Sequence, residues 1–377
     1  MSSSLPIEAM TVRVLSVPLD EPVPMSFAAL SARTSVLVTL RSGGLAGTGE
    51  SWVNHPPWAW RERVATLAGL RDAVVGADAY DPPALLDRLS ATVAGIARQW
   101  GAPGPLWQAL SGIDMAAWDL LGKVRNRSVA VLLADRAGGT AATRVGAYAS
   151  GIGPTAVAEL TERALALGLT AVKARVGFGA ETDRATLAAV RDVAGTGVEV
   201  FADANQAWDL PAAQRMCDVL GEYGVGFVEE PLAGDRPDEL RALAERTGMR
   251  LAGGENVYGT EAYAARLPWL AHVQPDASKT GGVSLADAVG RLPGDAWLSP
   301  HCYGGVATLA ASVHLAASAP RPGRVELDVR PNPLRTDLGT GPRLCDGDLV
   351  VPAGPGLGVE YDDALLDRYT VMEDSAC

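Results

Sequence analysis

The chain has 377 residues, which exceeds the usual size of one domain, so we expect two structural units. Its composition, with 48% hydrophobic and 20% charged residues, is typical of a globular protein and allows a sizeable core. The formal net charge of −12 argues against nucleic acid and anionic membrane surfaces as partners. An anionic substrate is compatible with this charge, because a bound cation can reverse the field locally.

The cysteines and the N-terminal residues give no sign of an oxidising compartment or a membrane. Cys217, Cys302, Cys345 and Cys377 are scattered without a close pair or a zinc-like spacing, which predicts free thiols. The first ten residues do not resemble a signal peptide. No apolar run approaches the roughly 20 residues that cross a bilayer. We therefore expect a cytoplasmic protein.

The first third of the chain has a mixed α+β pattern. Two strand-like runs are followed by a Gly-rich bend, which favours a hairpin packed beside helices. The expected strands are residues 11–17 and 35–40, the bend is 41–49, and the expected helices are 61–75, 83–96 and 110–123. We assign residues 1–140 to an α+β capping domain.

From about residue 145, short apolar runs alternate with amphipathic stretches at intervals of about 20–30 residues, the length of one strand-plus-helix unit. The expected strands are 145–150, 171–176, 198–202, 225–228, 250–252, 272–274, 296–298 and 325–327, and the helices are 154–167, 181–194, 211–223, 236–247, 261–270, 285–291 and 305–317. This pattern predicts an α/β fold with a (β/α)7β barrel over residues 141–340. A doubly wound open sheet is the alternative, but the sequence has no phosphate-binding Gly loop. Asp346-Gly347 suggests a hairpin in a tail, 341–377, that returns to the capping domain.

Polar residues collect where the predicted barrel strands end, which is where barrel active sites lie. In chain order they are Lys173, Arg175, Asp203, Asn205, Glu229, Glu255, Asn256, Asp276, His301 and Glu326. Asp203, Glu229 and Glu255 follow three neighbouring strands, and three converging carboxylates would repel one another without a cation. An all-oxygen set suits Mg²⁺ better than zinc. Each acid could instead cap the following helix, but three in succession favour a metal site.

Four segments resemble the enolase superfamily. Residues 201–205 (Phe-Ala-Asp-Ala-Asn), 227–231 (Phe-Val-Glu-Glu-Pro) and 253–256 (Gly-Gly-Glu-Asn) resemble its metal-binding strands. Residues 111–123 resemble the helix that leads into its barrel. The resemblance extends over nearly the whole chain and implies a homo-oligomeric, Mg²⁺-dependent enzyme with Asp203, Glu229 and Glu255 as metal ligands.

The residues after the sixth and seventh barrel strands resemble the mandelate racemase subgroup. Muconate-lactonising and dipeptide-epimerising relatives carry a lysine where this chain has Asp276, and His301 follows one strand later. A carboxylate bonded to one ring nitrogen fixes the histidine tautomer and raises its basicity. By contrast, His272 and His314 lie in apolar stretches, and we expect both to be structural.

The resemblance also implies roles for the remaining polar residues. Lys173 holds the substrate carboxylate, Glu326 bonds to that carboxylate opposite the metal, and Asn205 and Asn256 support the ligands. Many relatives carry a second lysine, which acts as a base, where this chain has Arg175. An arginine is a poor base because its pKa exceeds about 12, although it binds anions well.

This departure disfavours racemisation or epimerisation, which needs a base on each face of the carbon. Dehydration of a sugar acid to a 2-keto-3-deoxy acid needs one acid/base group, and we expect His301 to supply it. A cycloisomerase that opens a sugar lactone or an anhydro ring is the alternative, and a catalytically weakened ligand-binding protein or sensor is a third. Substrate selection is expected from capping-domain loops 22–33 and 51–60, with Trp52 and His55 as candidates.

Overall fold

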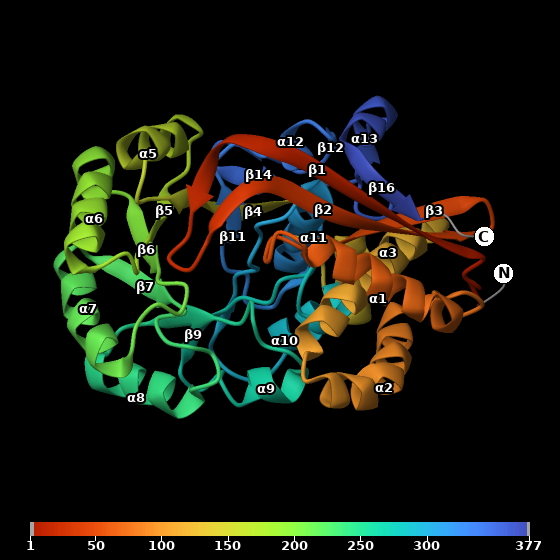
Figure 1. Cartoon of the computed structure of the whole chain (residues 1–377), viewed down its shortest axis with the longest axis horizontal. Helices are drawn as coiled ribbons and strands as arrows, with labels where there is room; N and C mark the ends of the chain where they lie inside the picture. The colour runs from red at the N-terminus through yellow and green to blue at the C-terminus, as the bar shows by residue number, and fades with distance from the viewer. Residues whose placement is uncertain (1–3, 375–377) are drawn as a thin grey trace.

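The computed structural model describes residues 4–374, so Cys377 lies outside the described part. A sheet and helices from the N-terminal part of the chain lie beside a ring of strands and helices formed by the later part (Figure 1). The N-terminal sheet has the strand order β16-β1-β2-β3, and every pairing in it is antiparallel. Its strands are β1 (Ala9–Pro24), β2 (Ala29–Ser42), β3 (Leu45–Ser51) and β16 (Thr370–Asp374). Its helices are α1 (Ala59–Val74), α2 (Pro82–Trp100), α3 (Pro103–Arg125) and α4 (Val129–Arg136).

The expectation that residues 41–49 form only a bend was wrong. Gly43 and Gly44 make the turn with positive φ angles of 56° and 78°, and β3 then pairs with β2. This strand contains two glycines, so it lacks the alternation of polar and apolar side chains from which a strand is predicted. A Cβ on Gly49 would lie 2.3 Å from the carbonyl oxygen of Gly112 in α3. Gly47 is equally crowded by the same helix. β3 therefore uses glycine to let α3 approach its backbone.

The later part of the chain confirms the predicted α/β class and its order of parallel strands. These strands are β4 (Arg144–Ile152), β5 (Ala171–Arg175), β6 (Glu199–Asp203), β7 (Val225–Glu229), β8 (Leu251–Gly253), β9 (Leu270–Val273), β10 (Trp297–Leu298) and β11 (Val325–Asp328). They pair in the order β10-β9-β8-β7-β6-β5-β4, and β11 pairs with the other edge of β4. Within residues 4–374 no ladder joins β10 to β11, although an isolated bridge links Leu298 to Pro322.

Seven helices alternate with these strands and cover the outside of the ring (Figure 1). They are α5 (Val157–Ala166), α6 (Ala180–Ala194), α7 (Leu210–Glu222), α8 (Pro237–Thr247), α9 (Thr260–Ala264), α10 (Gly282–Gly290) and α11 (Val306–Ser318). Helix α9 is shorter than the predicted 261–270. Pro268 favours the early end, because it has no N–H to donate to the carbonyl oxygen of Ala264, four residues earlier.

The C-terminal segment contacts both parts of the molecule. Strands β13 (Arg343–Cys345) and β14 (Asp348–Val350) form a hairpin, and β14 pairs with β4 of the barrel. Asp346 and Gly347 make the tight turn with φ angles of 54° and 82°. Helix α13 (Asp363–Tyr369) then leads into β16, which pairs with β1 (Figure 1). The remaining short elements are α12 (Pro333–Thr336), β12 (Gly339–Thr340) and β15 (Glu360–Tyr361).

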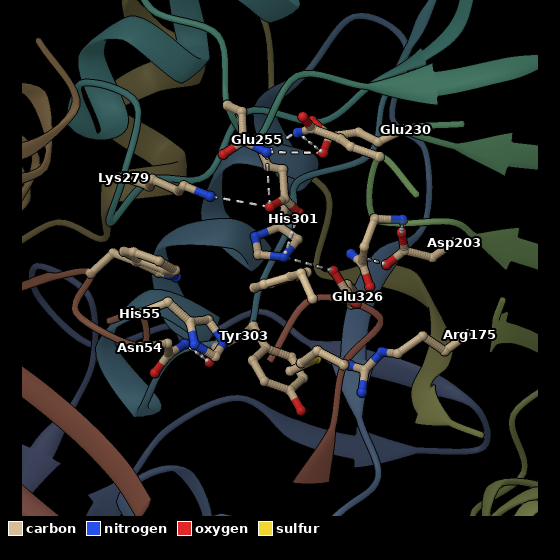
Figure 2. Close-up of a pocket in the computed structure, with 16 residues that line it drawn as sticks. Asn54, His55, Arg175, Asp203, Glu230, Glu255, Lys279, His301, Tyr303 and Glu326 are labelled. Atoms are coloured by element: carbon tan, nitrogen blue, oxygen red, sulfur yellow. Dashed lines mark hydrogen bonds and ion pairs between the residues drawn. The ribbon is translucent and has the colours of Figure 1, made fainter. Parts of the chain in front are cut away.

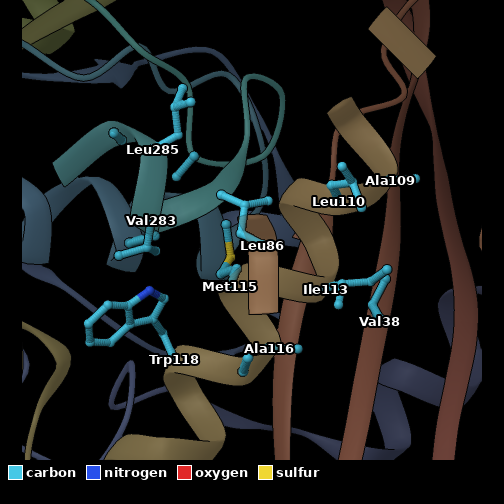
Figure 3. Packing of buried hydrophobic residues seen from close by; sticks show 14 of the residues in the cluster. Val38, Leu86, Ala109, Leu110, Ile113, Met115, Ala116, Trp118, Val283 and Leu285 are labelled. Carbon is cyan, nitrogen blue, oxygen red and sulfur yellow. The ribbon is translucent and has the colours of Figure 1, made fainter. Parts of the chain in front are cut away.

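Helix α3 joins the two parts and is buried along most of its length (Figure 3). Its residues Ile113 and Ala116 face Val38 of β2, while Trp118 lies near Val283 of α10. The Trp118 indole Nε1 donates to Ser284 Oγ at 2.8 Å, so this buried polar group is satisfied. Burying a large side chain of this kind stabilises the fold by roughly 1.5–3 kcal/mol.

The β1–β2 hairpin reaches from the N-terminal sheet across the barrel (Figure 1). Arg33 donates to Asp328 Oδ2 at 2.6 Å, and both side chains are buried. Arg175 donates to the carbonyl oxygen of Pro24 at 3.1 Å. The hairpin is therefore tied to two barrel strands, β5 and β11. No helix of the described residues is both long and apolar enough to cross a membrane.

Candidate active site

A cavity of about 420 Å³ lies between the carboxyl ends of the barrel strands and the capping segments. Its lining comprises Met25, Phe27, Trp52, Asn54, His55, Arg175, Asp203, Asn205, Gln206, Glu230, Glu255, Asn256, Lys279, His301, Tyr303 and Glu326 (Figure 2). The structure thus brings most of the sequence-derived candidates to one cavity. Lys173, Glu229 and Asp276 are not part of this lining. Lys173 contacts Asp203 and Asp276 contacts His301, both of which line the cavity, whereas Glu229 contacts Lys173.

Three carboxylates follow β6, β7 and β8, as the strand pattern predicts. Asp203 and Glu229 end neighbouring strands at paired positions, and Glu255 follows β8 by two residues. Asn205 supports Asp203 through its backbone N–H at 2.9 Å and its side-chain amide at 3.1 Å. Burial raises the pKa of Asp203, although Lys173 opposes the shift.

Lys173 lies among the acidic side chains of the barrel interior. Its Nζ is 2.6 Å from Glu229 Oε2, 3.1 Å from Glu326 Oε1 and 3.6 Å from Asp203 Oδ2. Burial lowers the pKa of Lys173, but Glu229 and Glu326 outweigh it, so the pKa is raised well above its usual value. Burial raises the pKa of Glu229 to about 8, with Lys173 acting in the opposite direction. Lys173 is therefore a fixed cation at the base of the cavity.

His301 is held from both ring nitrogens. Its Nδ1 lies 2.7 Å from Asp276 Oδ2, and Asp276 also accepts the Ser278 N–H at 2.7 Å. Its Nε2 lies 2.8 Å from Glu255 Oε2 and 3.8 Å from Glu326 Oε2. Burial lowers the pKa of His301, but Glu255 and Glu326 outweigh burial, so the pKa is raised well above 6.5. Asp276 thus orients the ring so that Nε2 points to the acidic side of the cavity.

Lys279 is a cavity residue that the sequence patterns did not identify. Its Nζ lies 3.1 Å from Glu255 Oε1 and 4.5 Å from the centre of the Trp52 ring. Burial opposes ionisation of Glu255, but His301 and Lys279 hold the pKa of Glu255 well below its usual range. Lys279 could have been found from its position in the sequence, because it lies three residues after Asp276, in the turn that leads into α10.

Glu230 is a second residue that was not identified, because Glu229 beside it was taken as the functional acid of that strand. Asn256 donates to both carboxylate oxygens of Glu230, at 3.0 and 2.9 Å, and Gln206 donates to Oε2 at 2.7 Å. Burial raises the pKa of Glu230 to about 7. Asn205, Gln206 and Glu230 all have left-handed φ angles, of 44°, 63° and 38°. Such conformations are costly for residues other than glycine, and they cluster at functional sites.

Arg175 ends β5, and its side chain points toward Tyr303 (Figure 2). Its guanidinium donates to the Pro24 carbonyl and lies 5.5 Å from the centre of the Tyr303 ring. Arg33 lies over the same ring at 4.8 Å. Burial lowers the pKa of Arg175, but Tyr303, Asp203 and Asp328 outweigh it and raise the pKa above its usual value. Arg175 therefore stays a cation and cannot accept a proton.

Two capping loops contribute to the cavity. Trp52 and His55 line it, as expected for the 51–60 loop, whereas Trp58 is 63% exposed and outside it. Asn54 donates to the Tyr303 carbonyl oxygen at 3.1 Å. Burial lowers the pKa of His55, and Lys279 and Arg175 add to the effect, so its imidazole is neutral. Its Nε2 has no hydrogen-bond partner among the described residues.

The three candidate metal ligands have the chemistry that a divalent cation requires. Asp203, Glu229 and Glu255 offer only oxygen ligands, and Glu229 Oε1 and Asn205 Oδ1 are buried without a hydrogen-bond partner. As the side chains lie, no three His, Cys, Asp or Glu residues of the described part converge on one coordination point. The reason is visible in the contacts, because Lys173 pairs with Glu229 and His301 pairs with Glu255. Glu255 would have to release His301 in order to share an ion with the other two.

Comparison with known families agrees with this geometry. Residues 8–134 match the mandelate racemase/muconate lactonizing enzyme N-terminal domain, and residues 156–365 match the enolase C-terminal domain-like family. The chain belongs to the enolase superfamily. Both matches lie in the mandelate racemase/muconate lactonizing enzyme group, which confirms the family expected from the sequence motifs and its capped (β/α)7β barrel. Members of this group use Mg²⁺.

Individual members of the group resemble the chain over most of its length. D-galactarolactone cycloisomerase from Agrobacterium fabrum is 30% identical, over 96% of this chain and 98% of that protein. Arabinonate dehydratase from Saccharolobus solfataricus is 31% identical, over 72% of this chain and 74% of its own length. A solved mandelate racemase/muconate lactonizing enzyme from Bordetella bronchiseptica superimposes with a TM-score of 0.86 at 33% identity, covering 97% and 99% of the two chains.

Proposed function

We propose that this member of the superfamily removes the proton next to the carboxylate of a sugar acid and then eliminates water, giving a 2-keto-3-deoxy acid. The observation that carries the proposal is the orientation of His301. Its Nδ1 is fixed by the buried Asp276 at 2.7 Å, and its Nε2 lies on the cavity side. A histidine placed in this way is suited to general acid–base work.

In the first step, His301, which becomes neutral once Glu255 has released its Nε2, takes the proton from C2 of the substrate at that nitrogen. The electron pair of the C–H bond becomes the second bond between C1 and C2, which leaves an enediolate. In the second step, this electron pair moves to form the C2–C3 double bond, and the C3 hydroxyl departs with the proton that His301 carries. The product is one water molecule and an enol, and the enol tautomerises to the keto acid. One histidine serves both steps if the C2 proton and the C3 hydroxyl lie on the same face.

Asp203, Glu229 and Glu255 are the residues that would hold Mg²⁺. When bound, the ion would supply positive charge opposite the oxygens of the enediolate. Lys173 stabilises the same negative charge from the barrel interior, because its ammonium is buried and its pKa is raised. Glu326 lies between Lys173 and His301, at 3.1 and 3.8 Å. Burial opposes its ionisation, but Lys173 and His301 outweigh burial and lower the pKa of Glu326, so its carboxylate is ionised and would have to take up a proton before it could donate to the substrate carboxylate.

Arg175 separates dehydration from racemisation. A racemase needs a proton acceptor on each face of the carbon, and Arg175 replaces the lysine that supplies the second one in many relatives. Its guanidinium is held as a cation by its surroundings. One-base chemistry with His301 is the reaction that these residues support.

Cycloisomerisation of a sugar lactone is a second candidate. It uses the same proton abstraction, but the ring oxygen leaves in place of the hydroxyl, so no water is lost. It is favoured by the 30% identity to a D-galactarolactone cycloisomerase over 96% of the chain. The residues named above serve either reaction equally well.

Proton NMR in heavy water with Mg²⁺ tests the proposal against a set of sugar acids and their lactones. Loss of the C2 proton signal reports abstraction whatever the later fate of the enediolate. A new keto-acid spectrum supports dehydration, ring opening supports cycloisomerisation, and exchange with inversion contradicts the role given to Arg175. No exchange with any acid, in a protein shown to bind Mg²⁺, would favour a ligand-binding protein or sensor.

A matched pair of histidine variants locates the base. His301→Asn should abolish exchange with Mg²⁺ still bound. His272→Asn should retain exchange, because His272 bonds to Ser299 at 2.9 Å in the strand body and lies outside the cavity. Normal exchange in His301→Asn would remove His301 from the mechanism.

A further inference from the structure

A second cavity, of about 480 Å³, lies at the opposite end of the barrel from the candidate active site. Its lining includes Arg144, Glu199 and Trp297, which begin strands β4, β6 and β10. Arg250 and Arg324 also line it, and each directly precedes a strand. Parallel strands all begin at one end of a barrel, so these residues mark its amino end. The second cavity shares no lining residue with the first.

Aromatic rings form the inner wall of this second cavity. Tyr148, Phe201 and Phe227 line it, and each is at most 5% exposed. The Phe201 and Phe227 rings stack with their centres 4.1 Å apart, and Tyr148 meets Phe201 edge-on at 5.6 Å. Because these rings are packed against one another, the wall is formed before any ligand binds. Trp297 is 49% exposed, so much of its indole surface is open to a ligand.

Positive charge gathers around the second cavity, although the whole protein carries a formal charge of −12. The lining contains three arginines and one glutamate. Glu199 pairs with Arg324 at 2.6 Å. Arg144 lies 3.8 Å from Asp346, whose side chain is 89% exposed, and such a pair contributes little. Arg250 forms no ion pair within residues 4–374, and its guanidinium is therefore available to an anion.

Arg250 lies beside the aromatic wall. Its Nε donates to the carbonyl oxygen of Gly226, near the start of β7, at 2.8 Å. A Cβ on Gly226 would lie 3.4 Å from Arg250 Nη2 and 3.2 Å from Cε1 of the Phe201 ring. The guanidinium and the buried ring therefore flank the same glycine. An apolar, planar wall with an unpaired guanidinium beside it suits a ligand that is both aromatic and acidic.

We propose that the amino end of the barrel is a second ligand site, which binds a small planar aromatic carboxylic acid. The ring of the acid packs against Phe201, Phe227 and Trp297. Its carboxylate pairs with Arg250, and Arg144 adds a second positive charge. The cavity volume of about 480 Å³ lies in the range of roughly 300–1,000 Å³ that is usual for small-molecule sites. This site is independent of the proposed reaction, which takes place at the other end of the barrel.

Calorimetry on the full-length protein with Mg²⁺ tests the site with three probes. 2-Naphthoate has both the aromatic ring and the charge, 2-naphthalenemethanol lacks the charge, and cyclohexanecarboxylate lacks the aromatic ring. We expect 2-naphthoate to bind at least about tenfold more tightly than either of the others, because ring and carboxylate each contribute. Equal affinities for the three probes, or no binding of 2-naphthoate at millimolar concentration, would overturn the proposal.

Arginine variants assign the binding to the second cavity. Arg250→Gln should lower the affinity for 2-naphthoate to about that for 2-naphthalenemethanol, and Arg250→Lys should keep part of it. Arg246→Gln is the matched control, because Arg246 is an exposed arginine four residues earlier that lies outside the lining. Arg175→Gln changes the catalytic cavity instead, and both of these variants should bind 2-naphthoate as the wild type does. Unchanged binding in Arg250→Gln, or a loss in either of the other two, would overturn the proposal.

A variant of Trp297 tests the placement of the ring. Trp297→Ala should weaken 2-naphthoate and 2-naphthalenemethanol by the same factor, because it removes aromatic surface and no charge. No change for either probe would contradict the contact between the ligand ring and Trp297. If circular dichroism shows that Arg250→Gln is unfolded, the three probes with the wild type and with Arg250→Lys become the decisive comparison.

Discussion

Asp276 accepts a hydrogen bond from His301 Nδ1 at 2.7 Å in a position where the aspartate side chain has no exposure to solvent. When His301 is neutral, this contact selects the tautomer that carries its proton on Nδ1, which leaves the Nε2 lone pair for the substrate. Asp276→Asn should keep the fold and lower kcat by about 10²- to 10⁴-fold, because the amide can hold the ring in the wrong tautomer. Steady-state kinetics on the best substrate would measure the loss.

Ser278→Ala is the control for that change. It removes the 2.6 Å hydroxyl contact to Asp276 Oδ1 and leaves the carboxylate in place. We expect a loss of about tenfold or less, since a single neutral hydrogen bond contributes roughly 0.5–1.5 kcal/mol. If Asp276→Asn were no slower than Ser278→Ala, Asp276 would have only a structural role.

The neighbouring acids Glu229 and Glu230 should differ in their effect on metal binding. Glu229→Gln removes a proposed metal ligand whose Oε1 has no hydrogen-bond partner among the described residues, and we expect Mg²⁺ affinity to fall at least about tenfold. Glu230→Gln removes a carboxylate already bonded to Gln206 and Asn256, and we expect a smaller change. Equilibrium dialysis or calorimetry with Mg²⁺ alone gives both affinities. The reverse order would assign the metal to Glu230.

The periodicity of the sequence was enough to predict the barrel and the edge at which its polar residues gather. Strand ends are visible in sequence because each apolar run stops at a charged residue, as Asp203 and Glu229 do. The same rule placed His301 and Asp276 on adjacent strands, and the structure brings their side chains into contact. These successes depend on regular local structure.

Contacts between distant segments could not be predicted in the same way. Lys279 and Tyr303 follow strands within loops, and their approach to the cavity depends on how each loop turns. Strand β3 was missed because Gly47 and Gly49 have no side chains to alternate. The pairing of Arg175 with the Pro24 carbonyl joins residues 151 positions apart, so no local pattern reports it.

Gly49 offers a test of the contact between the capping sheet and α3. A Cβ at this position would lie 2.3 Å from Gly112 O and 2.6 Å from Ala116 N, both of them backbone atoms. Because backbone cannot move aside as a side chain end can, Gly49→Ala should lower the free energy of unfolding by about 3 kcal/mol. Urea titration followed by circular dichroism would measure it.

Gly69→Ala is the matched control in the same domain. Gly69 lies inside helix α1, and a Cβ there would meet nothing within 4 Å. Alanine should stabilise the helix by about 0.5–1 kcal/mol relative to glycine. Equal effects of the two substitutions would mean that α3 and β3 can separate at little cost.

The buried His314 predicts how stability depends on pH. Its Nδ1 accepts the Ala130 N–H at 3.2 Å and its Nε2 donates to Leu357 O at 3.1 Å, so the neutral ring is required. Burial lowers the pKa of His314 from 6.5 to about 4. In the unfolded chain it titrates near 6.5, so between pH 6.5 and 4 the unfolded state binds more protons. Stability therefore falls as pH falls through this window, by about 3 kcal/mol from this one residue.

His314→Asn should be less stable at pH 7, because at least one of the two hydrogen bonds is weakened, but its stability should fall less with acid. The wild-type and variant unfolding free energies, measured by urea titration at pH 7.0 and 4.5, should approach each other by about 2 kcal/mol or more. The carboxylates and His272, whose pKa is also lowered to about 4, are the same in both proteins, so their contributions to the pH dependence cancel in this comparison. Parallel pH profiles for the two proteins would mean that His314 takes up its proton as readily in the folded protein as in the unfolded chain, which contradicts the bridge between Ala130 and Leu357.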